Sequence, residues 1–356
     1  MAELFIPTDH EIFQIKPGYR TGLPVMIGVH STVLGPAVGG LRIKHYDDSA
    51  TAISDVLRLS QAMTVKAAAI DNGTGGGKTV VPLPSGFTLT PQIKEAILLD
   101  VADQVHSLDG TYHVAPDVGT GPADIDIIRR RTPFAGGYSK EAGGAGGTTF
   151  GTYVGVDTAI RATVGSVLQK TSMKGLRVSI VGLGGIGTLL AKDYAKEGAI
   201  LTVADIDQSR KALAEEIGAK WVTPEEAMLE SCDVLAPCAL GGVLTHEIVP
   251  QLSAHIICGA ANNQLTNEDI ADALLARNIV YVPDFIANAG GVMYATGIEL
   301  HHRTEQGSEK HTRDGIKRNV ELVLDVSKTD KISTHVAAVD LALTRLKAAS
   351  SHVSQR

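Results

Sequence analysis

The sequence has few cysteines, no excess of positive charge and no long apolar run, and each shortage excludes a class of function. Its three cysteines, Cys232, Cys238 and Cys258, show no C-x-x-C spacing. They therefore predict neither a disulfide framework nor a zinc site, and no metal is expected. We interpret them as small apolar side chains in a reducing compartment.

The charge balance is acidic rather than basic. Lys+Arg 32 against Asp+Glu 39 gives a net charge of −7, so we expect no basic surface for nucleic acid or for an anionic membrane. No segment approaches the roughly 20 apolar residues that a membrane span needs. The first residues, MAELFIPTDHEIF, lack the apolar stretch of a secretory signal. These features predict a cytoplasmic protein whose partners are small molecules.

The length of 356 residues allows about two domains. The first part mixes a predicted strand, PVMIGVH, with a helical pattern that begins after Ser49. This mixture is typical of an α/β domain. From Arg177 onward, short apolar runs alternate with segments of helical spacing and predict a doubly wound parallel sheet. These runs begin near Val178, Leu201, Val234, Ile256 and Val280.

A glycine-rich segment, FAGGYSKEAGGAGGTT, separates the two halves and is expected to be a hinge or the lining of a cleft, with a simple surface loop as the alternative. Two helical stripes near the end, Ile316 to Leu324 and Val339 to Leu346, are expected to pack on the body of the protein. If the last helix returns to the first domain, residues 1–140 and about 326–356 form a substrate and oligomerisation domain. Residues 145–325 then form a Rossmann-type nucleotide domain.

The stretch NGTGGGKTVV contains four glycines and Lys78. It is one residue short of the spacing of a phosphate-binding P-loop, and the β-branched Thr79, Val80 and Val81 predict a strand instead of a helix. A lysine among glycines is either a solvated surface charge or, if a cleft closes over it, a general base. Desolvation would then lower its pKa from about 10.4 towards neutrality. Both readings remain open from the pattern alone.

The segment VSIVGLGGIGTLLAKDYAKEGAILTVAD carries the pattern of a dinucleotide site. A strand meets Gly182, Gly184 and Gly187 at G-x-G-x-x-G spacing, a helix follows, and a second strand ends at Asp205. The glycines allow a tight turn and close approach of the pyrophosphate, which then lies at the helix N-terminus. The Asp205 carboxylate favours the ribose hydroxyls of NAD over the phosphate of NADP, although Arg210 lies close behind it.

The order of motifs along the chain is similar to that of a known family. GPAVGG, MTVK, GGGK, PDVGT, GLGGIG, APCALGG, GAANNQL and PDFIANAGG occur in sequence, and together they resemble the amino acid dehydrogenases of the leucine, valine and phenylalanine branch, relatives of glutamate dehydrogenase. The resemblance covers nearly the whole chain. It implies reversible, NAD-dependent oxidative deamination of an L-amino acid to a 2-oxo acid and ammonia, by a homo-oligomer.

The resemblance also implies roles for individual residues. Lys78 would activate water as the general base, with the neighbouring Gly75, Gly76 and Gly77 leaving room for substrate. Asp117 would move protons to and from the amino group. Lys66, aided by Asn262, would bind the substrate carboxylate. One departure is that the family's GGTR reads GGLR here, with Leu41 in place of threonine.

The side-chain pocket that the resemblance implies is apolar, so a charged substrate such as glutamate is disfavoured. Phenylalanine is the favoured substrate, and leucine, valine or a larger aromatic amino acid are the alternatives. The residues expected to surround the substrate side chain and backbone are Val38, Gly40, Met63, Ala115, Pro116, Val292 and Ala295.

The cofactor-binding residues expected from the fingerprint and the resemblance are more numerous. They are Arg42, Thr148, Thr152, Gly182, Leu183, Gly184, Gly185, Ile186, Gly187, Asp205, Ile206, Ala239, Leu240, Ala260, Ala261 and Asn288. For Arg42, an ion pair inside the first domain is the alternative.

Two other functions are compatible with the same fold. A catalytically silent NAD-binding protein would be expected to have lost Lys66, Lys78 or Asp117, and all three are present. An enzyme that acts on simple amines would be expected to have lost the carboxylate partners Lys66 and Asn262, and both remain.

Overall fold

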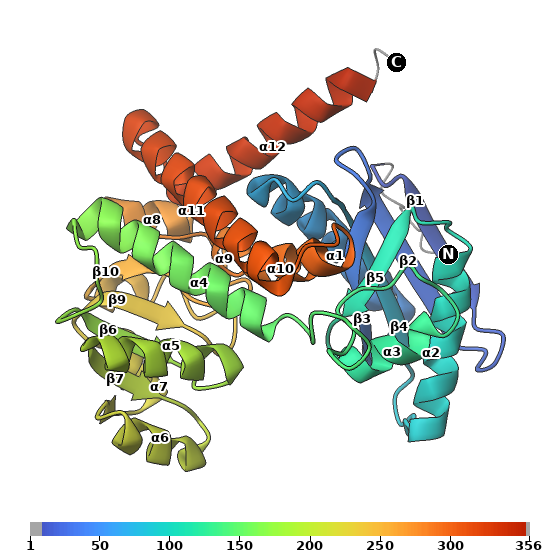
Figure 1. The fold of residues 1–356 in the computed structure, drawn as a ribbon, viewed down its shortest axis with the longest axis horizontal. Helices are drawn as coiled ribbons and strands as arrows, with labels where there is room; N and C mark the ends of the chain where they lie inside the picture. Colours follow the sequence, from blue (N-terminus) through green and yellow to red (C-terminus); the bar gives the residue numbers. More distant parts are fainter. Residues whose placement is uncertain (1–8, 354–356) are drawn as a thin grey trace. The chain divides into compact units, whose positions relative to one another are not determined.

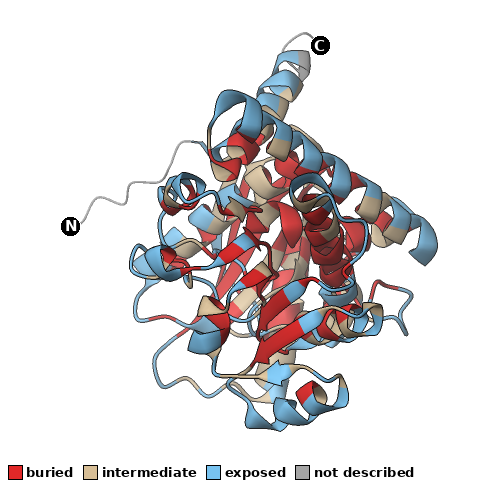
Figure 2. Ribbon diagram, turned by 90° about the vertical axis from the view of Figure 1, so that its left-hand side faces the viewer, coloured by how far each residue is buried: buried red, intermediate tan, exposed pale blue. Residues whose placement is uncertain are grey.

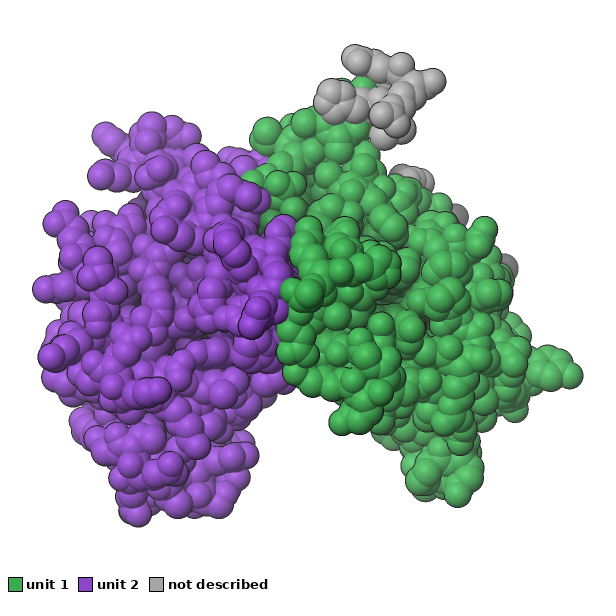
Figure 3. All heavy atoms as spheres, in the orientation of Figure 1, with its two compact units in different colours: residues 1–147, 295–305, 342–356 green, residues 148–294, 306–341 purple. Residues whose placement is uncertain are grey.

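The computed structural model describes residues 9–353, and Figure 1 shows the path of the chain. The first eight residues, part of the stretch examined for a secretory signal, lie outside the described residues. The chain forms two compact units, coloured separately in Figure 3. Of the described residues, unit 1 contains 9–147, 295–305 and 342–353, and unit 2 contains 148–294 and 306–341.

Unit 1 is built on a mixed five-stranded sheet with strand order β1-β2-β4-β3-β5. Strand β4 lies in the middle, antiparallel to β2 and parallel to β3. Helix α1 packs on one face through Val56 and Leu57, and α2 and α3 cover the other face. The elements are β1 (Ile12–Pro17), β2 (Pro24–Ser31), β3 (Ala37–His45), α1 (Ser49–Ile70), β4 (Gly75–Leu83), α2 (Pro91–His106), β5 (Tyr112–Pro116) and α3 (Pro122–Arg129).

Local capping chemistry fixes where the helices of unit 1 begin. The Asp48 side chain accepts a hydrogen bond from the Thr51 N–H at the start of α1. Thr90 does the same for Ile93 at the start of α2, where Pro91 occupies the first turn. The predicted strand PVMIGVH and the predicted helix after Ser49 are confirmed as β2 and α1.

Unit 2 is built on a six-stranded parallel sheet with strand order β11-β10-β9-β6-β7-β8. This is the doubly wound Rossmann order, so the predicted α/β fold class is confirmed. The sheet contains β6 (Arg177–Val181), β7 (Ile200–Ala204), β8 (Lys220–Trp221), β9 (Cys232–Pro237), β10 (Ala254–Ile257) and β11 (Val280–Tyr281). The two-residue strand β8 is not visible as an apolar run in the sequence.

The helices of unit 2 connect these strands and cover both faces of the sheet. They are α4 (Thr149–Thr163), the π-helix η1 (Val164–Leu168), α5 (Gly185–Glu197), the 3-10 helices η2 (Gln208–Arg210) and η3 (Val249–Gln251), α6 (Lys211–Glu216), α7 (Pro224–Leu229), α8 (Ile270–Ala276) and α9 (Asp284–Ala287). The sheet strands are largely buried, whereas the outer helix faces are exposed (Figure 2).

Three further helices, α10 (Gly290–Glu299), α11 (Glu305–Asp330) and α12 (Thr334–Val353), complete the chain. The unit bounds differ from the expected domain bounds, because residues 326–341 lie in unit 2 and residues 295–305 lie in unit 1. The stripe on α11 is buried as expected at Ile316, Val320 and Val323. On α12, Val339 and Leu346 are half-buried, Leu343 is 41% exposed, and the buried positions are Thr334, Ala337, Ala338 and Ala342. The expected stripe on α12 is therefore only partly buried.

Within residues 9–353, no helix combines the length and apolar character that crossing a membrane would require.

Candidate active site

Lys78 is a buried residue of the central strand of unit 1. It lies in the middle of β4, and every residue of that strand is buried. Only 5% of Lys78 is exposed. The strand forms as the β-branched Thr79, Val80 and Val81 predict. The structure therefore excludes the reading of Lys78 as a solvated surface charge.

The glycines before Lys78 have a packing role. A Cβ on Gly77 would lie 2.6 Å from the Tyr112 ring, and one on Gly76 would lie 2.1 Å from the Thr64 backbone nitrogen. A Cβ on Gly75 would lie 1.9 Å from the Ser31 carbonyl oxygen. The space beside these glycines is thus filled by the protein itself. The expectation that they leave room for substrate is wrong.

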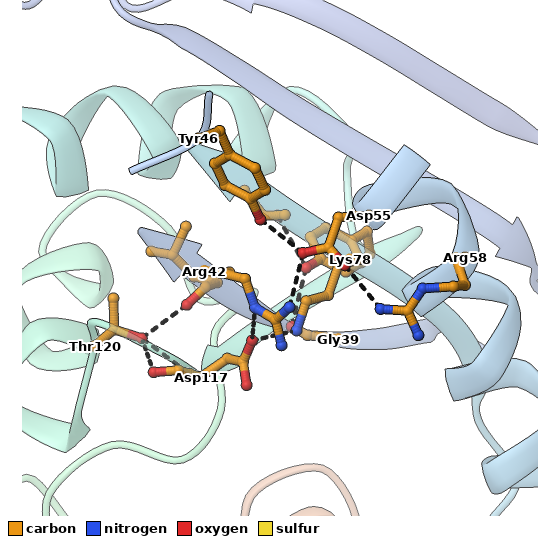
Figure 4. Close-up of polar contacts among 11 residues, drawn as sticks. Gly39, Arg42, Tyr46, Asp55, Arg58, Lys78, Asp117 and Thr120 are labelled. Carbon is orange, nitrogen blue, oxygen red and sulfur yellow. Dashed lines mark hydrogen bonds and ion pairs between the residues drawn. The ribbon is translucent and has the colours of Figure 1, made fainter. Parts of the chain in front are cut away.

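Asp117 faces Lys78 from the segment that follows β5. The Lys78 Nζ donates to the Asp117 Oδ2 at 2.5 Å. The turn that positions Asp117 is held by Thr120, whose Oγ1 accepts from the Asp117 N–H at 2.9 Å and donates to the Leu41 carbonyl at 2.9 Å. Figure 4 shows these contacts. Two residues that are 39 positions apart in sequence thus form one ion pair.

Gly40 lies against this pair and leaves no room for a side chain. A Cβ at this position would lie 2.6 Å from the Asp117 Cβ and 3.1 Å from the Lys78 Nζ. Its neighbour Leu41 is fully buried in the apolar core. Leucine in place of the family's threonine is therefore compatible with this core.

Arg42 extends the pair into a network that the sequence analysis did not identify. Its Nε donates to the Asp117 Oδ2 at 2.9 Å, and its Nη1 donates to the Asp55 Oδ2 at 2.7 Å. Asp55 also accepts from the Tyr46 hydroxyl at 2.7 Å and from Arg58 at 2.8 Å. The structure thus favours the internal ion pair for Arg42.

A sequence signal for Asp55 existed. Asp55 precedes Met63 by eight residues, which is about two helical turns, and Lys66 follows three residues later. A helix therefore aligns Asp55 on the face that carries these two predicted substrate residues.

Burial and neighbouring charges have opposite effects on the pKa values of this cluster. Desolvation lowers the pKa of Lys78 below its ordinary value of 10.5, although the nearby Asp117 acts to raise it. Burial acts to raise the pKa of Asp117, but the charges and hydrogen bonds of Lys78 and then Arg42 outweigh it, so that pKa falls below 3.8. For Asp55, contacts with Tyr46 and Arg42 overcome burial and lower the pKa to about 2. A lysine of lowered pKa gives up its proton more readily than a free lysine does.

The other predicted substrate residues of unit 1 lie on the elements around Lys78. Met63 and Lys66 are half-buried on α1, which packs over β4. Val38 and Gly40 are on β3, and the β3–β5 pairing sets Gly40 opposite Ala115. Pro116 ends β5, and Ala295, on α10, also belongs to unit 1. Asn262 and Val292 belong to unit 2.

The glycine turn of unit 2 has the backbone geometry of a dinucleotide site. Gly182, directly after β6, has φ of 104°, a conformation that side chains rarely adopt. A Cβ on Gly187 would lie 1.9 Å from the Gly182 carbonyl oxygen, whereas one on Gly184 would meet nothing within 4 Å. Helix α5 begins at Gly185. The turn is therefore tight where the chain packs on itself and open where a pyrophosphate would approach, which fits a dinucleotide.

Asp205 stands at the carboxyl end of β7, beside this turn. Its Oδ2 accepts from the Leu183 N–H at 2.6 Å and its Oδ1 from the Asp207 N–H at 2.9 Å. Ile206, the next residue, is 86% exposed. The carboxylate thus holds the turn in place, and its remaining lone pairs suit ribose hydroxyls. A negative charge there disfavours a 2′-phosphate.

The remaining cofactor candidates also lie in unit 2. Ala239 and Leu240 follow β9, and Ala260 and Ala261 follow β10, so both pairs lie beyond the carboxyl ends of parallel strands. The Asn288 Nδ2 donates to the Asn262 Oδ1 at 2.9 Å and to the Ala260 carbonyl at 3.3 Å. Thr148 is exposed, Thr152 is buried, and both approach Gly291.

Comparison with known proteins identifies relatives over nearly the whole chain. Residues 199–353 match the family model described as Glutamate/Leucine/Phenylalanine/Valine dehydrogenase, and residues 9–134 match that of the Glu/Leu/Phe/Val dehydrogenase, dimerisation domain. The leucine dehydrogenase of Geobacillus stearothermophilus is 38% identical over 95% of this chain and 91% of its own length. The phenylalanine dehydrogenase of Caldalkalibacillus thermarum is 36% identical over 86% of this chain and 83% of its own.

Among solved structures, the L-tryptophan dehydrogenase of Nostoc punctiforme is similar with a TM-score of 0.83 and 31% identity. The similarity covers 96% of this chain and 97% of that one.

Proposed function

Since this chain belongs to the glutamate, leucine, phenylalanine and valine dehydrogenase family and is an NAD-dependent amino acid dehydrogenase, we propose that it deaminates an apolar L-amino acid, with phenylalanine favoured. The observation that carries this proposal is the buried contact between Lys78 and Asp117. It supplies a base and a proton carrier in one place.

Lys78 and Asp117 divide the proton transfers. When bound, NAD supplies the acceptor for the hydride that leaves the substrate α-carbon. Neutral Lys78 then takes a proton from a water molecule as its oxygen bonds to the iminium carbon. Asp117 carries a proton from the new hydroxyl group to the nitrogen, the C–N bond breaks, and ammonia leaves as the carbonyl forms. The lowered pKa of Asp117 suits a group that holds this proton only briefly.

The substrate carboxylate is assigned to Lys66, with Asn262 as its helper. An ammonium group pairs well with a carboxylate, and Lys66 lies on the same helix face as Met63, which we assign to the side-chain pocket. NAD is assigned to the turn from Gly182 to Gly187 and to Asp205. The open space at Gly184 and the backbone donors of the turn support this assignment.

The proposed amino acid follows from the apolar character of the residues that we assign to its side chain. A glutamate side chain among them would lose its solvation without gaining a partner. These residues are Val38, Met63, Ala115, Pro116, Val292 and Ala295. Ala295 is small, which leaves space for a ring. The structural similarity to a tryptophan dehydrogenase favours a larger aromatic amino acid as the second candidate. Leucine and valine remain further alternatives, since a leucine dehydrogenase is 38% identical to this chain and a phenylalanine dehydrogenase is 36% identical.

We also propose that the protein is a cytoplasmic homo-oligomer. The match of residues 9–134 to a dimerisation domain supports assembly through unit 1.

A panel of L-amino acids tests the substrate proposal. Each is supplied with NAD at alkaline pH, and reduced cofactor is followed by absorbance. Phenylalanine is expected to give the highest kcat/KM, with tryptophan, leucine and valine turned over more slowly and glutamate least. Turnover of phenylalanine no better than that of alanine would refute the substrate choice. Highest activity with tryptophan would favour the second candidate.

A further inference from the structure

The guanidinium group of Arg42 connects two carboxylates. One edge donates through Nε to the Asp117 Oδ2 at 2.9 Å, and Nη1 donates to the Asp55 Oδ2 at 2.7 Å. Because the guanidinium is planar and rigid, the carboxylate on one side fixes the orientation of the guanidinium toward the carboxylate on the other side. The position of Asp55 therefore determines how Arg42 meets Asp117.

Asp55 is itself held firmly. Its carboxylate accepts from Arg42 on β3, from the Tyr46 hydroxyl just after β3, and from Arg58 one turn further along α1 (Figure 4). The side chain is only 11% exposed. Asp55 lines a hollow of about 470 Å³, together with Lys44, Tyr46 and Arg58. Three side chains therefore donate to this one carboxylate, which solvent barely reaches.

Four charges, of which Lys78 is buried and the other three are half-buried, alternate in sign along the contacts. Lys78, Asp117, Arg42 and Asp55 carry positive, negative, positive and negative charge, and their side chains are 6%, 26%, 17% and 11% exposed. Arg58 is 59% exposed, so solvent screens its charge. Without Asp55, Asp117 would be the remaining carboxylate paired with Arg42, and the positive charge of Arg42 would act more strongly on Lys78.

We propose that Asp55 is a positioning residue that acts through Arg42 to hold the Asp117 carboxylate on Lys78 and to set the pH at which Lys78 becomes a base. The inference rests on the proposed function, because it takes Lys78 as the base. Asp55 hydrogen-bonds Arg42, Tyr46 and Arg58, and it reaches the pair through Arg42. Its negative charge also acts on Lys78 through space and favours the ammonium form.

The proposal gives opposite shifts for two substitutions. Asp55→Asn removes a negative charge that favours the ammonium form, so Lys78 should lose its proton at lower pH. Arg42→Gln removes a positive charge that disfavours the ammonium form, so the proton should be lost at higher pH. Each shift should be about 1 to 2 pH units, the size expected for a unit charge roughly 6 to 12 Å away at an effective dielectric constant of about 20.

The shift is measured in two ways on the full chain. The first is the acidic limb of the kcat/KM profile for phenylalanine oxidation. The second is NMR titration of lysines labelled with 13C at Cε, with the Lys78 signal assigned by its loss in Lys78→Arg. The titration needs no turnover. Failure of the proposed function would appear as an inactive wild-type protein, whereas failure of this inference would appear as titrations that do not move.

Matched variants separate electrostatics from loss of structure. Asp103→Asn also removes a carboxylate that joins two arginines of unit 1, Arg20 and Arg131, and it should leave the Lys78 titration unchanged. Asp55→Glu should restore the wild-type limb. If Asp55→Asn does not fold, Arg42→Gln still tests the predicted direction. The proposal is overturned if the Lys78 titration stays at the wild-type pH in either folded variant, or if both variants shift it the same way.

Discussion

At the scale of single residues, the central feature is an ammonium group kept almost entirely from water beside one carboxylate. Burial of Lys78 and its contact with Asp117 oppose each other, and the result is a pKa below that of a free lysine. The sequence alone left Lys78 as either a surface charge or a base. The fold excludes the surface charge, because strand β4 is central and buried.

Gly40 offers a test of how closely the pair is packed. Gly40→Ala would place a methyl group 2.6 Å from the Asp117 Cβ and 3.1 Å from the Lys78 Nζ, so the two groups must separate. We expect kcat/KM for phenylalanine to fall by about tenfold or more, since a displacement near 1 Å at reacting groups has effects of this size. Steady-state kinetics measures the loss. NAD affinity, measured by calorimetry, should change little; unaltered kinetics would show that the pair tolerates the methyl group.

Asp55 and Arg42 mark the limit of reasoning from sequence at this scale. Lys78, Asp117 and Lys66 were identified through motifs that a known family shares. Asp55 belongs to no such motif, and its contact with Arg42 depends on how α1 packs over the sheet. Its position two turns before Met63 indicated the correct helix face but not the partner.

At the scale of elements, the segments with an apolar run were predictable and those without one were not. The apolar runs at Val178, Leu201, Val234, Ile256 and Val280 are strands of one parallel sheet. Strand β8 has two residues and no apolar run, so it carries no periodic signal. Helix α12 buries Ala337, Ala338 and Ala342, whereas Val339 and Leu346 of the expected stripe are half-buried and Leu343 is exposed. The spacing of the larger apolar residues therefore located the buried face only in part.

The glycines of β4 give a prediction about packing. Gly77→Ala would bring a methyl group to 2.6 Å from two atoms of the Tyr112 ring, which is fully buried. We expect unfolding free energy to fall by about 1 to 3 kcal/mol, as for other overpacked cores. Chemical denaturation measures this change.

Gly121 is the matched control for that experiment. It lies in the same unit, with φ of −145° and nothing within 4 Å of its Cβ position. Gly121→Ser should therefore leave stability unchanged or slightly raised, because serine is favoured at a helix N-cap. Equal loss of stability in the two variants would mean that contact with Tyr112 is not the cause.

At the scale of the whole molecule, the chain divides into two units that are each discontinuous in sequence. The sequence indicated two domains and a return to the first near residue 326, whereas unit 1 takes in residues 295–305 and resumes at Ala342. Ser308 donates to the Tyr294 carbonyl and Arg313 pairs with Asp157, and both contacts lie within unit 2. These contacts anchor α11 in unit 2. They join α11 to residues outside the helix, so the sequence pattern within α11 does not predict them.

Assembly is a second property at this scale. The family match over residues 9–134 leads us to expect a homo-oligomer. Light scattering after size exclusion should give a mass that is a whole multiple, two or greater, of 37.3 kDa. A mass of 37.3 kDa at micromolar concentration would contradict the expectation.

The most direct test of the account is NAD reduction by wild type, Lys78→Ala and Lys78→Arg, with phenylalanine across pH 7 to about 11. The wild-type rate should rise with pH as Lys78 loses its proton, with a midpoint below 10.5. Both variants should bind NAD but lose at least about a thousandfold in kcat, since arginine keeps the charge without accepting a proton. A Lys78→Arg enzyme with wild-type turnover would contradict the role of Lys78 as the base.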